Sequence, residues 1–291
     1  MQNNFFPSNF AIKTNARASL KNNWFSAFAI TLLILFAVLF VVYFTAMLTS
    51  FFRIDNLDLL GGEIKFSKDL VCLLLINLFS LVLELFLIVP LLFGSIKWFW
   101  KLSLGTVAPI SEVFYYYSTI ANFKKVVFVS ISLFFRAFVI LIICLSPSIL
   151  TYILSNSVFL GVFGSIPTTF TESFKPLANM LSVLGYIAFY IGIFRYILVP
   201  AVLIKYPNLS VNKTIKYATK LSFGYRSKAF VLLLSFLGWF VLCLAGIPIF
   251  FVVPYFLTSY CFLSRYAIFH SEENIKRKEK MAEQNTANFT Y

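Results

Sequence analysis

Acidic residues are scarce in this sequence, and histidine is almost absent. Its 291 residues include only 11 Asp and Glu and a single His, His270. The few carboxylates form no cluster that would hold a divalent metal ion, and one His gives no basis for a His-rich metal centre or for acid–base catalysis. The sequence therefore predicts neither a metal nor a cofactor.

Cysteine spacing and enzyme motifs are missing as well. The four Cys residues lie singly inside apolar runs, where Cys acts as a small apolar filler. The motifs G-x-S-x-G, H-E-x-x-H and the P-loop do not occur. We therefore expect that the chain is not an enzyme. A lipid-modifying enzyme is a third-ranked interpretation, in which Glu84, the only carboxylate within the long apolar runs, would have to act as general base.

What the sequence has in excess is apolar surface. Apolar residues make up 60% of the chain and charged residues only 12%, against about 45–50% and about 25% in soluble domains. One compact water-soluble core cannot bury this surplus. The composition predicts an all-α membrane protein.

A helix needs roughly 20 residues to cross a bilayer, and the apolar runs of this sequence provide about six such segments. The expected spans are residues 24–52, 70–96, 126–154, 177–204, 229–245 and 249–269. The last two form one run of about 60 Å as a helix, which is twice the hydrocarbon thickness. Gly246-Ile247-Pro248 breaks it, because Gly adopts turn dihedrals and Pro cannot continue the helix. We expect a polytopic transmembrane helical bundle of about six spans (residues 24–270).

Basic residues set the expected orientation. Of the 24 Lys and Arg, 18 fall in the segments on the N-terminal side of this bundle and four in the opposite loops, residues 53–69 and 155–175. Lys and Arg are enriched in cytoplasmic segments, so residues 1–23 and the polar tail 271–291 are both expected in the cytoplasm. Basic charge placed between apolar runs indicates anionic lipid headgroups as the partner rather than nucleic acid. No protein partner can be identified.

Three inner segments have the pattern of amphipathic helices at the membrane surface. Lys13, Arg17 and Lys21 recur at helical spacing within residues 1–23, and residues 111–123 form a less clear case. In residues 211–222 one face is apolar and the opposite face carries Lys213, Lys216 and Lys220. These three lysines are either ordinary positive charge at a lipid surface or a specific docking face for anionic lipid or a membrane partner.

Two span pairs have the same order of elements. The spans that contain Val89-Pro90 and Val199-Pro200 each lead into an amphipathic segment, a basic stretch and the next span. This order fits either a parallel internal repeat or generic membrane patterning. Gly238, in the fifth span, is expected to let a neighbouring helix approach closely.

Three charged residues lie inside the expected spans, where charge is costly. Glu84, Arg136 and Arg195 fall at depths of about 13 to 19 Å from the inner boundary, counted at 1.5 Å per residue, so they could meet. One interpretation is a Glu84–Arg136 ion pair, with Arg195 reaching towards the cytoplasm. The other is a cluster with one uncompensated positive charge that binds an anionic headgroup or solute.

Two stretches carry a family resemblance. The first stretch precedes the first expected span and reads Ala16-Arg17-Ala18-Ser19-Leu20-Lys21-Asn22-Asn23-Trp24. The second covers the last third of the chain, and its matching residues are Arg195-Tyr196, Tyr206-Pro207, Ser210, Gly224, Leu234-Ser235-Phe236-Leu237-Gly238-Trp239, Gly246-Ile247 and Pro254-Tyr255. Together they resemble a bacterial family of multi-span membrane proteins known only as a domain of unknown function. That family is distantly similar to the membrane domain preceding some glycerophosphoryl diester phosphodiesterases. The chain departs from the family pattern at Lys205 and in its long first outer loop.

The resemblance implies residence in the bacterial plasma membrane and no established activity, and it transfers no catalytic residue. Together with the residues themselves, it favours a non-enzymatic multi-pass protein that binds anionic lipid or a membrane partner at its basic face. The alternative is a small transporter whose pathway includes Glu84, Arg136 and Arg195.

Overall fold

The computed structural model describes residues 7–52, 68–154 and 168–288, and every regular element in these ranges is helical. The all-α fold class is therefore confirmed. The expected outer loops fall largely in residues 53–67 and 155–167, which lie outside the described part of the chain.

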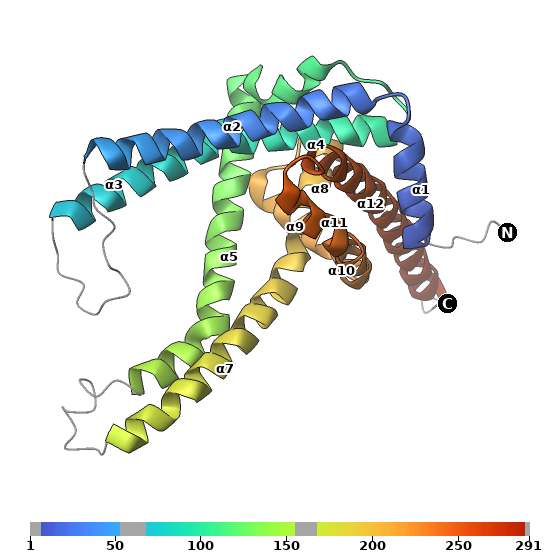
Figure 1. The fold of residues 1–291 in the computed structure, drawn as a ribbon. Helices are drawn as coiled ribbons and strands as arrows, with labels where there is room; N and C mark the ends of the chain where they lie inside the picture. Colours follow the sequence, from blue (N-terminus) through green and yellow to red (C-terminus); the bar gives the residue numbers. More distant parts are fainter. Residues whose placement is uncertain (1–6, 53–67, 155–167, 289–291) are drawn as a thin grey trace.

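Figure 1 shows the elements in their order along the chain. They are α1 (Asn9–Leu20), α2 (Trp24–Phe51), α3 (Lys68–Leu83), the π-helix η1 (Glu84–Ile88), α4 (Val89–Ser103), the 3₁₀ helix η2 (Ile110–Tyr117), α5 (Ile120–Leu154), α7 (Thr168–Ile193), the 3₁₀ turn η4 (Phe194–Tyr196), α8 (Val199–Lys205), α9 (Val211–Ser222), α10 (Arg226–Leu234), α11 (Leu237–Leu242), the 3₁₀ turn η5 (Cys243–Ala245) and α12 (Ile249–Asn288).

Within the described ranges, five continuous helical stretches are long and apolar enough to cross a membrane, and a bent pair makes a sixth. The stretches are Trp24–Phe51, Leu70–Ser103, Ile120–Ile153, Phe174–Lys205 and Ile249–Met281, and the pair is Arg226–Leu234 with Leu237–Ala245, bent by 42°. The expectation of about six spans is confirmed. The structure also breaks the last apolar run where the sequence predicts, since Gly246 has φ 82° and α12 begins at Ile249.

Several helices end beyond the expected boundaries. The second stretch continues past residue 96 to Ser103, and α12 continues through the expected boundary at residue 270 without a break. The fifth span is interrupted between α10 and α11, at Ser235-Phe236. Its sequence contains no Gly or Pro at that point, so composition gave no sign of the bend.

The same order of elements occurs three times along the chain. A short helix (α1, η2 or α9) precedes an outgoing helix (α2, α5 or α10–α11), and a returning helix follows (α3–α4, α7–α8 or α12). Each returning helix contains a Val-Pro pair, namely Val89-Pro90, Val199-Pro200 and Val253-Pro254. The structure thus extends the two similar units seen in the sequence to three.

The packing of these units is cyclic. Helix η2 packs on α4 and α9 packs on α8, so each of these short helices covers the returning helix just before it in the chain. Helix α1, the first short helix, packs on α12, the last returning helix, and this contact closes the cycle. The returning helices α4, α8 and α12 contact one another. We call this assembly of α4, α8, α12 and the three short helices the hub. It contains most of the fully buried side chains, including Trp98, Leu203 and Leu263.

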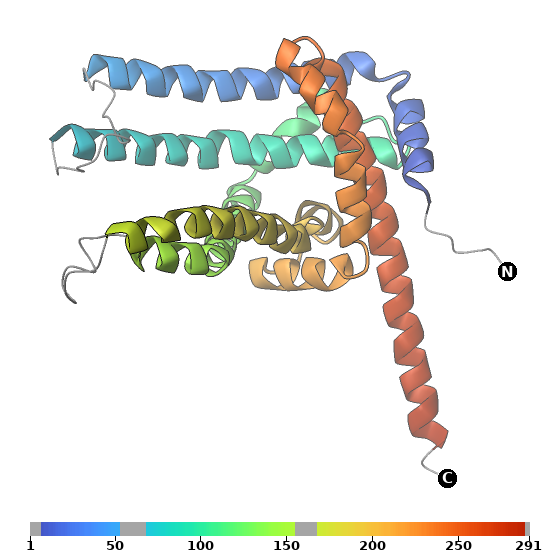
Figure 2. The same ribbon diagram turned by 60° about the horizontal axis from the view of Figure 1, so that its bottom comes forward.

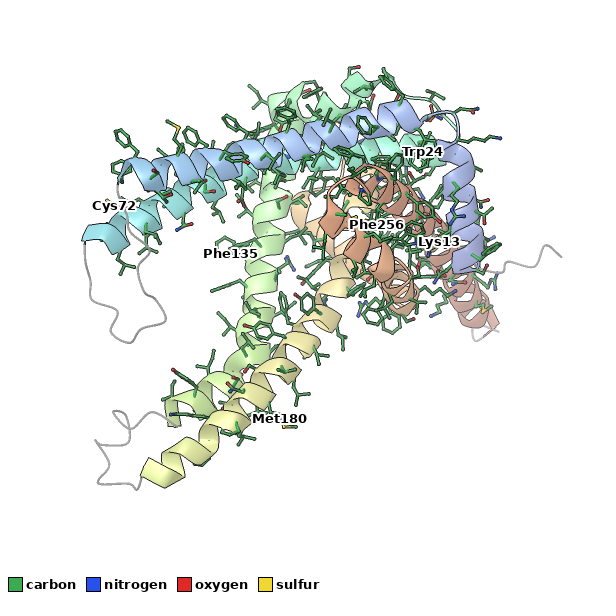
Figure 3. The ribbon with its side chains drawn as sticks, viewed as in Figure 1. Lys13, Trp24, Cys72, Phe135, Met180 and Phe256 are labelled. Carbon is green, nitrogen blue, oxygen red and sulfur yellow. The ribbon has the colours of Figure 1, made fainter. Side chains whose placement is uncertain are left out.

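The long hairpins project from the hub in different directions (Figures 1 and 2). One is α2 with α3–η1, the other α5 with α7, and the C-terminal half of α12 extends on the opposite side of the hub. Figure 3 shows Phe135 and Met180 on the second hairpin, away from Phe256 in the hub. Both are more than half exposed, in keeping with an apolar environment around the hairpins.

Tyrosine hydroxyls satisfy backbone carbonyls next to two of the Val-Pro prolines. Proline removes the helical hydrogen bond to the carbonyl four residues before it, and its ring bends the helix in that turn. Tyr117 of η2 donates to the Leu87 carbonyl, three residues before Pro90, and Tyr260 of α12 donates to the Ile197 carbonyl, three residues before Pro200. In both cases the donor comes from another element, so the proline kink is fixed by the hub.

Close helix approach occurs at other glycines than Gly238. A Cβ at Gly238 would meet nothing within 4 Å, so the expected close contact there is wrong. A Cβ at Gly94 would lie 1.8 Å from the Val113 carbonyl oxygen, and one at Gly185 would lie 2.7 Å from the Cys144 carbonyl oxygen. Gly94 therefore permits the α4–η2 contact and Gly185 the α5–α7 contact.

Candidate anionic-ligand site

Helix α9 presents its lysines outward. Its inner face carries the buried Thr214, Ile215, Ala218 and Leu221, which pack on α8, α12 and α5. Lys213, Lys216 and Lys220 are exposed on the opposite face, which we call the α9 lysine face. The apolar face is thus covered by protein rather than by lipid. The same holds for α1, whose Ile12, Ala16 and Leu20 are fully buried.

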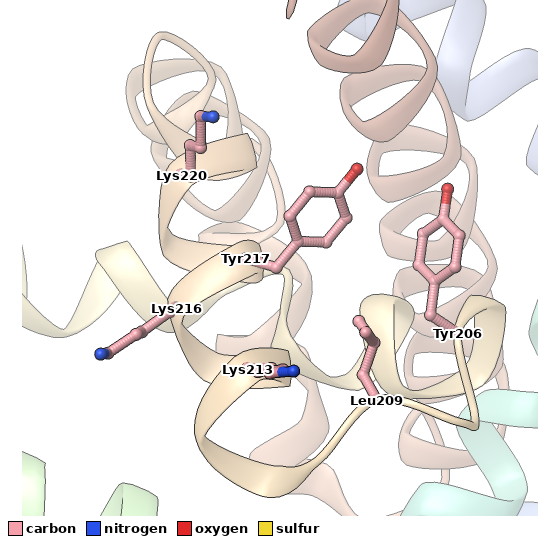
Figure 4. A pocket seen from close by; sticks show the side chains of 6 residues that line it. All are labelled: Tyr206, Leu209, Lys213, Lys216, Tyr217 and Lys220. Carbon is pink, nitrogen blue, oxygen red and sulfur yellow. The ribbon is translucent and has the colours of Figure 1, made fainter.

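A surface groove of about 480 Å³ runs along the α9 lysine face. All three lysines line it, together with Leu209 and the rings of Tyr206 and Tyr217 (Figure 4). The two rings meet edge to face with centroids 5.7 Å apart. The groove therefore combines cations with an aromatic wall, a lining that suits an amphiphilic anion better than a small hydrated one.

Glu272 of α12 fixes one wall of this groove. Lys205 Nζ lies 2.8 Å from Glu272 Oε2, and the Tyr206 hydroxyl donates to Glu272 Oε1. Burial and the hydrogen bond to Glu272 raise the pKa of Tyr206 to about 12, so its phenol stays protonated at neutral pH. Tyr206 is thereby held as a donor to the carboxylate, and its ring forms the wall.

A second groove of about 1000 Å³ adjoins the first, because Lys216 and Lys220 line both. It lies between α9 and the C-terminal half of α12, which contributes Arg277, Lys278 and Glu279. The sequence did not connect these α12 residues with α9. Residues 271–291 were expected to form a separate tail, whereas α12 continues unbroken to Asn288 and its residues from Ser271 to Met281 line the groove beside α9.

The hub lysines divide into paired and unpaired groups. Lys97 and Lys101 pair with Glu112, and Lys205 pairs with Glu272. Among the described residues, no ion pair involves Lys213, Lys216 or Lys220. Glu112 and Glu272 neutralise lysines within the hub, while the α9 lysine face keeps its positive charge.

The structure does not pair Glu84 with Arg136. Glu84 is exposed in η1, and the ion pairs of the described residues do not include it. Arg136 instead hydrogen-bonds to Ser132 on its own helix and donates to Asn212 Oδ1 of α9 at 3.2 Å. Helix α5 begins at Ile120, earlier than the expected residue 126, and its first half packs on the hub. Arg136 therefore lies beside α9.

Arg195 lies at the other end of α9. Its carbonyl accepts a hydrogen bond from Ser222 Oγ, and its guanidinium lies over the ring of Tyr196. Asn212 and Ser222 are ten residues apart in one helix, or about 15 Å. Arg136 and Arg195 thus contact opposite ends of α9, and no described contact joins either to Glu84. The grooves above are lined by other residues.

A helical chain with five or six candidate spans and a cationic hub face is consistent with a multi-pass membrane protein. The chain belongs to the family described as Protein of unknown function (DUF975), which matches residues 6–266. This match gives no link to glycerophosphoryl diester phosphodiesterases. No curated protein and no solved structure matches the chain.

Proposed function

We propose that this chain is a non-enzymatic multi-pass protein of the bacterial plasma membrane whose α9 lysine face binds anionic phospholipid headgroups. The distribution of basic residues favours an orientation with both termini, and hence the hub, on the cytoplasmic side. The cytoplasmic leaflet is rich in anionic lipid, and each Lys or Arg near its surface contributes about 1 kcal/mol to binding.

The observation that supports the proposal best is the charge of the two connected grooves. Lys213, Lys216 and Lys220 have no acidic partner among the described residues, although neighbouring lysines do. Lys216 and Lys220 line both grooves, and Tyr206 and Tyr217 add an aromatic wall. A phosphate at the lysines, with the adjoining glycerol and acyl region against the rings, would satisfy both parts of this lining.

The test is a titration of the full-length protein in mild detergent with fluorescent phosphatidylglycerol and, separately, phosphatidylcholine. We expect the variant K213Q/K216Q/K220Q to bind phosphatidylglycerol at least about tenfold more weakly, since three such charges contribute about 3 kcal/mol before screening. Phosphatidylcholine binding should change little, because its headgroup carries no net charge.

A matched control separates a site from general electrostatics. The variant K21Q/K124Q/K276Q removes the same charge from three exposed lysines that do not line the first groove. It should bind phosphatidylglycerol as the wild type does. Equal losses in both triple variants, or no loss in K213Q/K216Q/K220Q, would contradict the proposal.

A further inference from the structure

A second groove system lies on the other side of the hub, between the first hairpin and η2. An apolar trough of about 510 Å³ runs between α2 and the η1–α4 helix, which lie side by side in Figures 1 and 2. Leu33, Ala37 and Phe40 line it from α2, Leu87 and Leu91 line it from the returning helix, and η2 closes one end. From Leu33 to Phe40 the α2 wall is about 10 Å long.

The end of the trough at η2 opens into a polar pocket of about 400 Å³. Ser111, Glu112 and Ser118 line this pocket, and Phe114 and Tyr117 line both the pocket and the trough. The two spaces therefore adjoin each other at these two rings. Tyr117 is also the residue whose hydroxyl donates to the Leu87 carbonyl, so the junction between them is fixed to the returning helix.

Two lysines lie beside the polar pocket, paired with Glu112 of its lining. Lys97 Nζ lies 2.8 Å and Lys101 Nζ 3.0 Å from the same oxygen, Glu112 Oε1. Two cations share one carboxylate. The Lys97 side chain is only 14% exposed and lies over the Tyr115 ring, whereas that of Lys101 is 38% exposed. Lys101 is thus the more exposed of the two cations beside the pocket.

We propose that this combined space binds one membrane phospholipid, with an acyl chain in the trough and the phosphate at the mouth beside Lys101, Ser111 and Ser118. The trough is cut into candidate membrane spans, so bilayer lipid is the ligand that reaches it by lateral diffusion. Its lining is apolar, and the adjoining pocket is polar with Lys101 beside it, which matches the order of acyl chain and headgroup in a phospholipid. No residue is shared with the α9 lysine face, so this site does not depend on the proposed function.

The trough is tested by filling it. The full-length protein, purified in mild detergent and equilibrated with phosphatidylglycerol, is examined by native mass spectrometry for lipid retained on the ion. On K213Q/K216Q/K220Q, which lacks the α9 lysine face, we expect one retained lipid, and adding A37W, whose indole occupies the trough, should lower that bound fraction at least tenfold. A46W, added to the same variant, places the same side chain on an exposed part of α2 outside the trough and should leave the bound fraction unchanged.

The mouth is tested by comparing phosphatidylglycerol with diacylglycerol, which has the acyl chains but no phosphate. The wild type should retain phosphatidylglycerol at least tenfold better, and K101Q should lose most of that preference while still retaining diacylglycerol. K101Q leaves the trough intact, so the comparison of the two lipids still tests the proposed site if A37W fails to fold.

Three results would overturn the inference: full retention by A37W, an equal loss in A46W, which would mean annular lipid only, or an unchanged headgroup preference in K101Q. K213Q/K216Q/K220Q should still retain the lipid in this trough. Failure of the α9 lysine face to bind phosphatidylglycerol would therefore leave this site standing, and the converse holds as well.

Discussion

Replacing Gly94 with alanine is expected to disrupt the hub and to reduce the yield of folded protein. A Cβ at this position would lie 1.8 Å from the Val113 carbonyl oxygen and 2.7 Å from its carbonyl carbon. Both are backbone atoms, so no side-chain rotation relieves the overlap, and η2 must move away from α4. Overpacking usually costs about 1–3 kcal/mol, and an overlap with backbone atoms places this substitution at the upper end of that range.

The shift would spread through contacts that depend on the position of η2. Val113 and Tyr116 are buried against α4, and the Trp98 indole donates to the Ala108 carbonyl at 2.8 Å in the connection between α4 and η2. We expect the apparent Tm of G94A in detergent, followed by tryptophan fluorescence, to fall by at least about 6 °C, since 1 kcal/mol corresponds to roughly 2–4 °C for a domain of this size.

Gly238 provides the matched control. It is also a helical glycine, but a Cβ there would meet nothing within 4 Å. G238A should leave the Tm unchanged or raise it slightly, because alanine restricts the unfolded chain more than glycine does. A G94A protein as stable as the wild type would show that the α4–η2 contact is looser than the structure has it.

The contrast between these glycines illustrates what sequence could and could not predict. Composition and run length sufficed for the all-α class and the number of spans, and Gly246-Pro248 sufficed for the last break, because these depend on local chemistry alone. Whether a glycine faces another backbone depends on which helices meet. Gly238 was expected to be the close contact, although the packing places the closest approach at Gly94.

The partner of Arg136 could not be predicted, for a related reason. Counting residues from the expected boundary brought Arg136 to the depth of Glu84 and Arg195, but Val126 and Val129 of α5 belong to the buried core and Arg136 hydrogen-bonds to α9. Its partner, Asn212, comes from a helix 76 residues further along the chain. A one-dimensional count cannot show that a short helix packs beside a span.

The amphipathic pattern gave the right faces but the wrong neighbour. The periodicity of residues 211–222 separates buried from exposed positions as the structure does. A stripe of apolar residues, however, does not distinguish lipid from protein as its partner. In α1 and α9 the apolar face packs on the rest of the hub. The exposed residues whose role has to be explained are therefore the lysines rather than the apolar residues.

Replacing Glu112 with glutamine is expected to destabilise the hub almost as much as G94A. Its carboxylate accepts hydrogen bonds from Lys97 and Lys101 and is only 16% exposed. Glutamine keeps the shape but removes the charge, which leaves the mostly buried Lys97 without compensation. Losing one partner of such a pair costs about 3 kcal/mol, so we expect the apparent Tm to fall by about 6 °C.

The pH dependence of this loss has a defined sign. Burial by itself raises the pKa of Glu112, but the hydrogen bonds and charges of Lys97 and Lys101 outweigh it and hold the pKa below its ordinary value of 4.5. A carboxyl group with a lowered pKa stabilises the fold above its unfolded pKa, and this stabilisation is lost as the pH falls through the lowered value. The Tm difference between wild type and E112Q should therefore be constant from pH 8 to about 5.5 and shrink only below about pH 4.5.

A double-mutant cycle distinguishes charge compensation from a general packing defect. K97M removes the buried cation and keeps an unbranched apolar side chain, so E112Q/K97M should recover part of the stability that E112Q loses. K101Q should cost less than K97M, because the Lys101 side chain is 38% exposed and that of Lys97 is 14% exposed. Strictly additive losses in E112Q/K97M would mean that Glu112 acts through shape rather than charge.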